Sequence, residues 1–277
     1  PKDKVDGWRG VSGRFKHMSL HNNYAQIYEI ISFVIRKEEG FWSDFCRDHQ
    51  AKFEQLIERF IGNGVLDKDD EKTAEIAVKG CYPLHPVSTF ILPRLSEKVA
   101  QNERTLFTFL SADSKNTLTD FLERVPEGFS LLTPDYLFDY FEPLLKKEPY
   151  TSDVHKLYTT TRKVLQKLEN DSLAAKIIKT ISLIYIVEQF EKLPPVKDII
   201  FNTFIDSVGD IRIIEDTLND LIKKEYVIYQ KKSNGYLKIK ESTGVDITVE
   251  IENVIEKTKY NVSVKEVLNK SSYDNYM

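Results

Sequence analysis

The stretch GCYPLHPVSTFILPRLSEKVAQNERTLFTFL, residues 80–110, decides which fold we expect for this chain. Pro83 and Pro86 break the chain before a run in which apolar residues recur every three or four positions, the pattern of one helix face. Pro93 lies inside this run and should kink the helix or split it in two. The run ends at residues 100–102, and a second short helix should follow with Arg104 in its first turn. The region therefore predicts packed helices.

Apolar residues at helical spacing also mark the segments on both sides of this stretch. They predict helices from residue 22 or 23 to about 40, over 41–62, near 74–79, and over 118–125, 133–145, 153–169 and 172–190. The helix over 133–145 is rich in aromatic residues, which we interpret as core or a partner-helix surface, because acidic neighbours disfavour nucleic acid. His85, between Leu84 and Pro86, is expected to be buried as a cap or packing residue.

The dipeptide Pro194-Pro195 marks the clearest boundary in the sequence. Helices should follow over 196–204 and 211–224, and then two strands over 226–230 and 236–240, joined by a turn that contains Asn234-Gly235. Helix, turn, helix and hairpin is the winged-helix pattern. The predicted fold is thus mostly α, a multi-helix bundle followed by a winged-helix domain with a small β-hairpin. The predicted units are 1–21 (end of another domain, or linker), 22–192 (helical region), 193–241 (winged helix) and 242–277 (a helical extension).

The second helix of the predicted winged helix is unsuited to reading a DNA groove. Its middle carries Glu215, Asp216 and Asp220, where such a helix needs cations or amides. The wing is the better candidate for contact with phosphates, through its lysines Lys231, Lys232, Lys238 and Lys240. The helix over 153–169 also has a basic face, with Lys156, Arg162, Lys163 and Lys167, which either meets phosphates or is simply solvated.

Composition and motifs exclude several function classes. The 277 residues carry a net charge of −4, so the whole chain is not a nucleic-acid polycation. The two cysteines, Cys46 and Cys81, form no metal-binding pattern and fit reduced cytosolic thiols, and no apolar run could span a membrane. No GxxxxGK[ST] phosphate loop and no hydrolase or zinc-protease motif occurs, so we expect no catalysis by this chain alone. The start at Pro1 suggests a piece of a longer protein.

Arg104 is an unusual residue for its position. A cation is unfavourable at the positive end of a helix dipole, but it would suit an incoming phosphate beside exposed backbone N–H groups. The alternative is a surface arginine paired with Glu103 or Glu97.

The sequence AQNERTLFTFL, preceded by YPLHPVSTFILPRLSEKV, resembles the lid segment of large bacterial P-loop ATPases of the AAA+/STAND type. These are close to origin-recognition initiators and to BREX-type phage-defence ATPases. The resemblance implies that Arg104 is the lid arginine that reaches the γ-phosphate of ATP. GRFKHMSLHNNYAQIYEII is similar to the segment leading into the first lid helix, which makes Arg14 a second nucleotide-sensing candidate, or else a solvated loop arginine. Such ATPases commonly carry a winged helix after the lid.

The first hypothesis for function is therefore a non-catalytic C-terminal regulatory part of a bacterial P-loop ATPase. ATP would be bound mainly by a missing N-terminal domain, without a metal site in this chain. The winged helix would relay the nucleotide state to DNA or to a protein partner in the cytoplasm, in phage defence. The expected protein partners are a second copy of the chain and a component of the defence system. The alternatives are a winged-helix DNA-binding regulator and a structural helical adaptor, both without nucleotide.

Overall fold

A computed structural model describes residues 24–68, 70–100, 104–124, 128–170, 172–231 and 233–240. Within these ranges the chain is mostly helical, with one two-stranded antiparallel sheet, which confirms the predicted predominance of helices. The expectations for residues 1–21, including Arg14, and for the extension over 242–277 fall outside the described residues.

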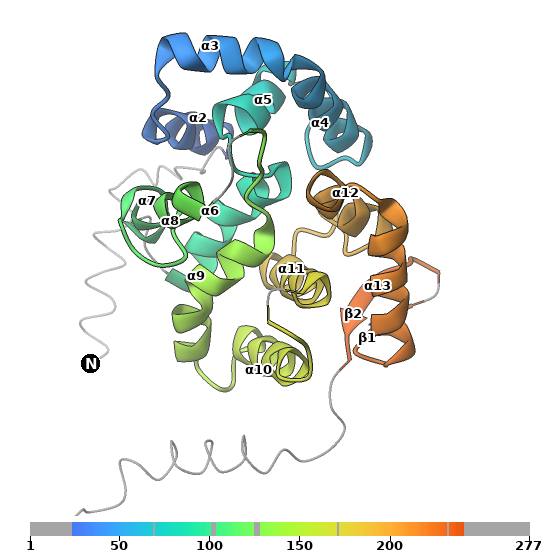
Figure 1. Cartoon of the computed structure of the whole chain (residues 1–277). Coiled ribbons are helices and arrows are strands. Elements are labelled where there is room, and N and C mark those ends of the chain that lie inside the picture. Colours follow the sequence, from blue (N-terminus) through green and yellow to red (C-terminus); the bar gives the residue numbers. More distant parts are fainter. Residues whose placement is uncertain are drawn as a thin grey trace, which may run out of the picture.

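The elements follow one another in the order drawn in Figure 1. They are α2 (Tyr24–Val34), α3 (Glu39–Asp48), α4 (Gln50–Gly62), α5 (Glu71–Glu75), the π-helix η1 (Ile76–Gly80), α6 (Pro86–Ala100), α7 (Arg104–Ser111), α8 (Leu118–Arg124), α9 (Pro134–Lys147), α10 (Asp153–Leu165), α11 (Leu173–Val187), α12 (Lys197–Val208), α13 (Ile211–Lys223), β1 (Val227–Tyr229) and β2 (Leu237–Ile239).

The helix α11 lies at the centre of the molecule (Figure 1) and packs against α6, α9 and α10 as well as α13 and β2. Its sequence is apolar on nearly every face, which is the pattern of a helix enclosed by others. Ser172 caps its N-terminus by accepting a hydrogen bond from the backbone N–H of Ala175. A single central helix thus joins the helical body to the C-terminal hairpin.

One charged residue of α11, Lys179, is also buried, with only 8% of its surface exposed. Its ammonium group donates to a carboxylate oxygen of Asp139 on α9 at 2.7 Å. A second carboxyl on α9, that of Asp135, is buried nearby and accepts a hydrogen bond from the hydroxyl of Thr133 at 2.5 Å. Burial raises the pKa of both aspartates, and Lys179 opposes the shift by favouring their charged forms.

Helix α6 runs without a break through Pro93, so the expected split into two helices is wrong. Pro93 has no N–H to donate within the helix. Next to this position, the Arg94 guanidinium donates to the carbonyl oxygen of Phe90 at 2.8 Å and stacks on the Phe90 ring. These local contacts, together with the burial of Pro93 itself, hold the helix together across the proline.

His85 stands immediately before α6, and it is fully buried, as the sequence predicted. Its Nδ1 accepts a hydrogen bond from the backbone N–H of Val87 at 3.2 Å, and its ring meets that of Phe60 edge-on at 5.1 Å between centroids. Because Nδ1 is an acceptor, the proton of the neutral ring is on Nε2. Burial lowers the pKa of His85 to about 3, against a smaller opposing effect of the Asn202 backbone.

The predicted single helix over 41–62 is instead two helices, α3 and α4, that meet at His49. The bend lets side chains of both helices converge on one ring. Phe45 and His49 lie 6.2 and 5.3 Å from Phe129, measured between ring centroids, and Phe53 lies 5.1 Å from it. This aromatic cluster, which also contains Tyr82, explains why the helical pattern of the sequence does not continue as one rod.

Other boundaries also differ from the expectation. Helix α2 ends at Val34 and not near Gly40, and the ammonium group of Lys37 donates to the carbonyl oxygen of Gly80 at 2.5 Å. The helix expected near 74–79 is the short α5 followed by a π-helical turn. Helix α10 ends at Leu165, before the expected residue 169.

The aromatic residues of α9 belong to the core, as expected. Phe138 and Phe141 are fully buried, and the hydroxyl groups of Tyr136 and Tyr140 donate to Asp120 and to the carbonyl oxygen of Thr105. The aromatic side chains of α9 therefore pack against neighbouring helices.

Of the C-terminal elements, α13 and β2 pack on α11, while α12 packs on α13 and β1 pairs with β2. Val227 pairs with Ile239 and Tyr229 with Leu237 in the hairpin, whose turn places Gly235 at a left-handed φ of 65°. The backbone N–H of Leu237 also donates to the carbonyl oxygen of Pro195 at 2.7 Å. The segment that leads from α11 to α12 thus lies against β2 as a short third extended piece.

Candidate functional site

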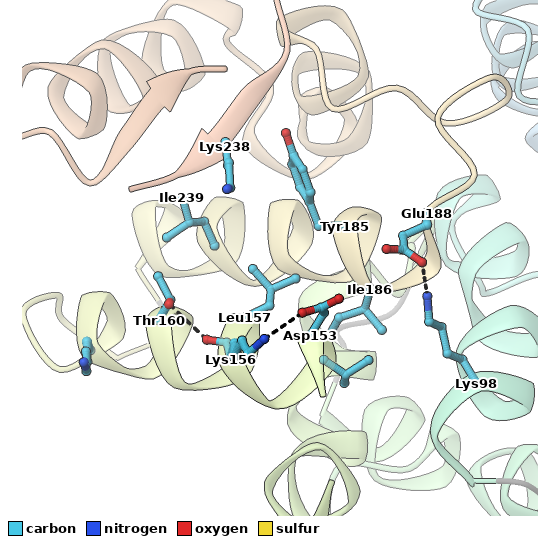
Figure 2. Close-up of a pocket in the computed structure, with 12 residues that line it drawn as sticks. Lys98, Asp153, Lys156, Leu157, Thr160, Tyr185, Ile186, Glu188, Lys238 and Ile239 are labelled. Atoms are coloured by element: carbon cyan, nitrogen blue, oxygen red, sulfur yellow. Dashed lines mark hydrogen bonds and ion pairs between the residues drawn. The ribbon is translucent and has the colours of Figure 1, made fainter. Parts of the chain in front are cut away.

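A groove with a volume of about 690 Å³ opens between α10, the C-terminal parts of α6 and α11, and β2. Figure 2 shows Lys238 above it on the hairpin, α10 below it and the pair Lys98–Glu188 at one end. We call it the basic groove. Its lining residues are Lys98, Asp153, Val154, Lys156, Leu157, Thr160, Lys163, Tyr185, Ile186, Glu188, Lys238 and Ile239.

Positive charge exceeds negative charge in the basic groove, where four lysines face two acidic residues. Both acidic residues are engaged by lysines of the groove itself. Lys98 pairs with Glu188, and the Lys156 ammonium lies 3.0 Å from a carboxylate oxygen of Asp153. Lys163 and Lys238 also line the groove, so its lining contains more lysines than acidic residues. A groove with this excess favours anionic ligands.

Helix periodicity places the α10 residues of the groove. Lys156, Thr160 and Lys163 are spaced by four and three residues, so they share one face of the helix. The opposite face is buried through Tyr158, Thr161 and Leu165, which fixes the rotation of the helix about its axis. Ser152 begins the helix by accepting a hydrogen bond from the backbone N–H of His155 at 3.1 Å.

Lys238 lies in β2 between the buried residues Leu237 and Ile239 and is itself only partly buried. Both Lys238 and Ile239 line the groove. In Figure 2 Lys238 lies close to the ring of Tyr185, which projects from α11. The hairpin thus adds a cation to the groove from the side opposite α10.

The structure separates the four wing lysines that the sequence grouped as phosphate contacts. Lys238 lines the basic groove, whereas Lys240 pairs with Glu225 and Lys231 is exposed at the edge of the turn. Lys232 is not among the described residues. The groove combines one of the wing lysines, Lys238, with Lys156 and Lys163 from the basic face of α10. The sequence analysis treated the wing and this helix face as two separate predictions.

Of the two arginines predicted to sense nucleotide, Arg104 is the first residue of α7 and is exposed. Helix α7 packs against α6, α8 and α2, on the side of the molecule away from the hairpin (Figure 1). Arg104 does not line the basic groove. Arg14 falls outside the described residues. Arg104 and Lys238, which the sequence predicted for nucleotide sensing and for phosphate contact, therefore lie on different parts of the molecule.

Several residues of the basic groove were not predicted from the sequence, among them Lys98 on α6, Tyr185 on α11 and Glu188 just after α11. The local sequence pattern contains no signal for them, because they meet through the packing of α6, α11 and β2.

A second cavity, of about 340 Å³, lies where α8 and α12 approach the start of α6. His85 lines it, and in the described residues its Nε2 makes no hydrogen bond of regular geometry. Ser130, Thr203 and Asp206 also line it, and Asp206 is paired with Arg59 of α4 at 2.6 Å. With a neutral imidazole and a neutralised carboxylate, this cavity has no excess charge among these groups.

The thiols and acidic residues do not suggest redox or metal chemistry within the described ranges. Cys46 and Cys81 are both free, and burial raises the pKa of Cys81 to about 12, which keeps it protonated and unreactive. Across the same ranges, the side chains of His, Cys, Asp and Glu form no cluster of three or more that could hold a metal ion. None of the described helices has the length and apolar character needed to cross a membrane.

Comparison of this sequence and structure with protein-family models, with curated proteins and with solved structures finds no match.

Proposed function

We propose that this chain is a non-catalytic regulatory module that binds the phosphate backbone of a nucleic acid in the basic groove. The module is built from a helical body and a winged-helix unit, α11 to α13 with β1 and β2. The convergence of lysines from α6, α10 and β2 on one groove is the observation that carries the proposal.

The arrangement of the C-terminal elements supports the winged-helix assignment. Three helices pack together with a two-stranded hairpin, and the segment around Pro195 forms a hydrogen bond to the last strand. Helix, extended piece, two helices and hairpin is the order of a winged helix. The usual reading helix is unsuitable here, because Glu215, Asp216 and Asp220 on α13 are all exposed and would repel phosphates.

The groove suits a phosphate backbone better than an acidic peptide. Its cations lie in a row along α10 and across from it on β2, and a row of phosphates presents negative charge at regular intervals. Backbone binding of this kind needs no base-edge donors or acceptors. Because the net charge of the whole chain is −4, binding of nucleic acid needs a surface where lysines gather locally, as they do in this groove.

We further propose, from the lid resemblance, that the module belongs to a bacterial P-loop ATPase with a role in phage defence. ATP would be held by a domain outside this chain, and Arg104 would contact its γ-phosphate. The exposure of Arg104 at the start of α7 supports such a contact, since the guanidinium lies on the surface of the helical body.

Exposed apolar residues favour a protein contact as a second function. Ile211 and Ile213, in the first turn of α13, are 50% and 51% exposed. A structural adaptor that docks a protein partner through α13 is the alternative to nucleic-acid binding.

Replacing Lys156, Lys163 and Lys238 together by Gln should weaken the binding of a fluorescein-labelled nucleic acid of 20 nucleotides by at least about tenfold at moderate salt. The slope of the logarithm of the binding constant against the logarithm of salt concentration should fall by about two to three, because each lost phosphate contact removes about one counterion. Fluorescence anisotropy at four salt concentrations measures both.

The matched control replaces Lys68, Lys72 and Lys115 by Gln, which are exposed and outside the groove. It changes the net charge by the same amount and should leave the slope unchanged. Equal slopes for the two triple variants, or no binding by the wild-type protein, would overturn the nucleic-acid proposal.

Arg104→Ala in the full-length protein should lower the steady-state rate of ATP hydrolysis by at least about tenfold if the arginine contacts the γ-phosphate. A coupled assay of phosphate release measures this rate. Arg47→Ala is the control, because Arg47 is an exposed arginine on α3 that pairs with Asp44. Unchanged ATP turnover in Arg104→Ala, or a full-length gene without a phosphate-binding loop, would contradict the ATPase proposal. Neither result would affect the proposal that the basic groove binds nucleic acid.

A further inference from the structure

We propose that the basic groove is the docking site for the segment of this chain that follows β2, residues 246–256, which packs its apolar side chains against α10 and the hairpin. This inference rests on the proposed function in one respect, because a docked segment would occupy the groove in place of nucleic acid and so regulate binding there. The contact itself depends on apolar side chains and requires no free cation in the groove.

The groove has an apolar lining to which three elements contribute. Val154 and Leu157 of α10 are only partly buried, and both also pack on the core. Ile186 near the end of α11 and Ile239 of β2 are buried and line the groove as well. Covering side chains such as Val154 and Leu157 with a further apolar surface is favourable in proportion to the area removed from water.

Tyr185 forms a rigid part of the groove wall. Its hydroxyl group donates to the side-chain oxygen of Gln230 at 3.2 Å, and its ring packs on Phe190 with centroids 5.2 Å apart. Phe190 in turn contacts Tyr236 of the hairpin, at 5.9 Å between centroids. Figure 2 shows the ring of Tyr185 projecting from α11 toward the hairpin. A wall held in this way loses little conformational entropy when a segment docks against it.

The length of the groove fits a short helix. Its lining residues on α10 run from Asp153 to Lys163, so this side of the groove extends for about 15 Å at the rise of an α-helix. A helix that lies beside α10 over this distance would present about ten of its own residues to the groove.

The sequence after β2 has a matching apolar pattern. Ile247, Ile251, Val254 and Ile255 recur at the spacing of one helix face, and Val249 is the exception on the opposite face. They belong to the helical extension expected from the sequence, which lies outside the described residues. In a helix this row of side chains would extend for about 12 Å, which is within the length of the groove.

The chain leaves the sheet beside the groove. Ile239, the last residue of β2, lines the groove, and the structure describes the chain as far as Lys240. Residues 241–246 follow and contain the sequence Ser-Thr-Gly, which favours a turn. Six residues span at most about 20 Å, which is enough to bring the apolar row back over the groove. Because the segment is attached to β2, its docking does not require two molecules to meet.

A photo-crosslinker in the groove tests the contact in the full 277-residue chain. The variant Thr160→p-benzoylphenylalanine places the crosslinker on α10 at a residue that lines the groove. Irradiation should join it to a peptide that contains Ile251, which mass spectrometry identifies. The yield should persist at about 1 M salt, because screening weakens charge pairs and not apolar contacts. The control, Lys115→p-benzoylphenylalanine, is exposed outside the groove and should not form this crosslink.

Two variants of the segment separate its apolar face from its charge. Ile251→Asp and Asn253→Asp add the same negative charge, but only the first removes a side chain of the apolar row. Ile251→Asp should lower the crosslink yield at least about fivefold, and Asn253→Asp should leave it within about twofold of wild type. Thermal unfolding of each variant confirms that the protein is folded. Ile251→Asp should also bind single-stranded oligo-dT of twenty nucleotides at least about fivefold more tightly, because the groove is then open.

Different results overturn different claims. No crosslink from position 160 to residues 246–256, or equal yields in Ile251→Asp and Asn253→Asp, would overturn the docking inference and leave the lysine variants to test the groove. Crosslinks between isotopically light and heavy chains in a mixture would assign the groove to the segment of a second copy and also overturn it. Loss of the crosslink in Ile251→Asp, with no binding of oligo-dT by either protein, would support docking and contradict the nucleic-acid proposal.

Discussion

Replacing His85 by Asn should remove most of the acid sensitivity of folding between about pH 6 and pH 3. In the folded wild type the pKa of His85 is about 3, whereas an unfolded histidine titrates near 6.5. Between these two values the unfolded chain binds a proton that the folded chain excludes. The stability that depends on neutral His85 is therefore fully present above the unfolded pKa and is lost as the pH falls.

The expected size of this effect follows from the linkage relation. Stability should fall by about 1.4 kcal/mol for each pH unit in the window, or on the order of 4 kcal/mol across it. Asparagine retains an acceptor for the N–H of Val87 and does not titrate. The variant should be less stable than wild type near pH 7, because the edge contact of the imidazole with Phe60 is lost, but its stability should vary much less with pH.

Urea unfolding at intervals of half a pH unit measures how the free energy of unfolding depends on pH in the wild type and in His85→Asn. His155→Asn is the matched control, since His155 is a partly buried histidine on α10 that lies outside the His85 cavity. A slope in His85→Asn as steep as in wild type would show that another group causes the acid sensitivity.

Replacing Lys179 by Met should destabilise the protein by about 3 kcal/mol or more near pH 8, because a buried pair loses its cation while its carboxylate stays. The substitution preserves the length and apolar stem of the side chain and removes the ammonium that bonds to Asp139 at 2.7 Å. Asp139 and the neighbouring buried Asp135 would then be left without that compensating charge.

The pH dependence of this loss identifies its cause. Burial already raises the pKa of Asp139, and removing Lys179 raises it further, so the carboxyl takes up a proton more readily as the pH falls. The loss should therefore be smaller at pH 4.5 than at pH 8. The double variant Lys179→Met with Asp139→Asn should recover most of the stability at pH 8.

Lys224→Met is the matched control for the ion pair. Lys224 lies 2.8 Å from Asp220 on α13, in a pair whose side chains are 54% and 53% exposed. Its removal should lower the free energy of unfolding much less than the removal of Lys179 does, because an exposed ion pair contributes little. Equal losses in the two single variants, measured by chemical denaturation, would contradict the assignment of Lys179 as a buried structural cation.

The sequence predicted elements whose pattern is local. The helices around the apolar runs of α6 and α11, the hairpin around Asn234-Gly235 and the burial of His85 between Leu84 and Pro86 are all present. These features follow from periodicity and turn chemistry within about fifteen residues.

The features that the sequence did not predict depend on distant partners. The bend at His49 depends on Phe129, which lies eighty residues further along the chain. The continuity of α6 through Pro93 is an exception, because it depends on the local contact of Arg94 with Phe90, which helix propensity does not describe. The basic groove joins Lys98, Lys163 and Lys238 from three elements, so spacing along the chain contains no trace of it. The lid resemblance and the nucleotide role of Arg104 remain predictions.

The central position of α11 has a consequence for how this protein can change over generations. One helix packs at the same time on α9 and α10 of the body and on α13 and β2 of the C-terminal unit. If the C-terminal unit were replaced by one from another gene, its side chains would not be complementary to those of α11. If α11 were changed to fit, it would no longer pack well against α9 and α10. We therefore expect the helical body and the C-terminal unit to be inherited together, and substitutions in one to be compensated by substitutions in the other.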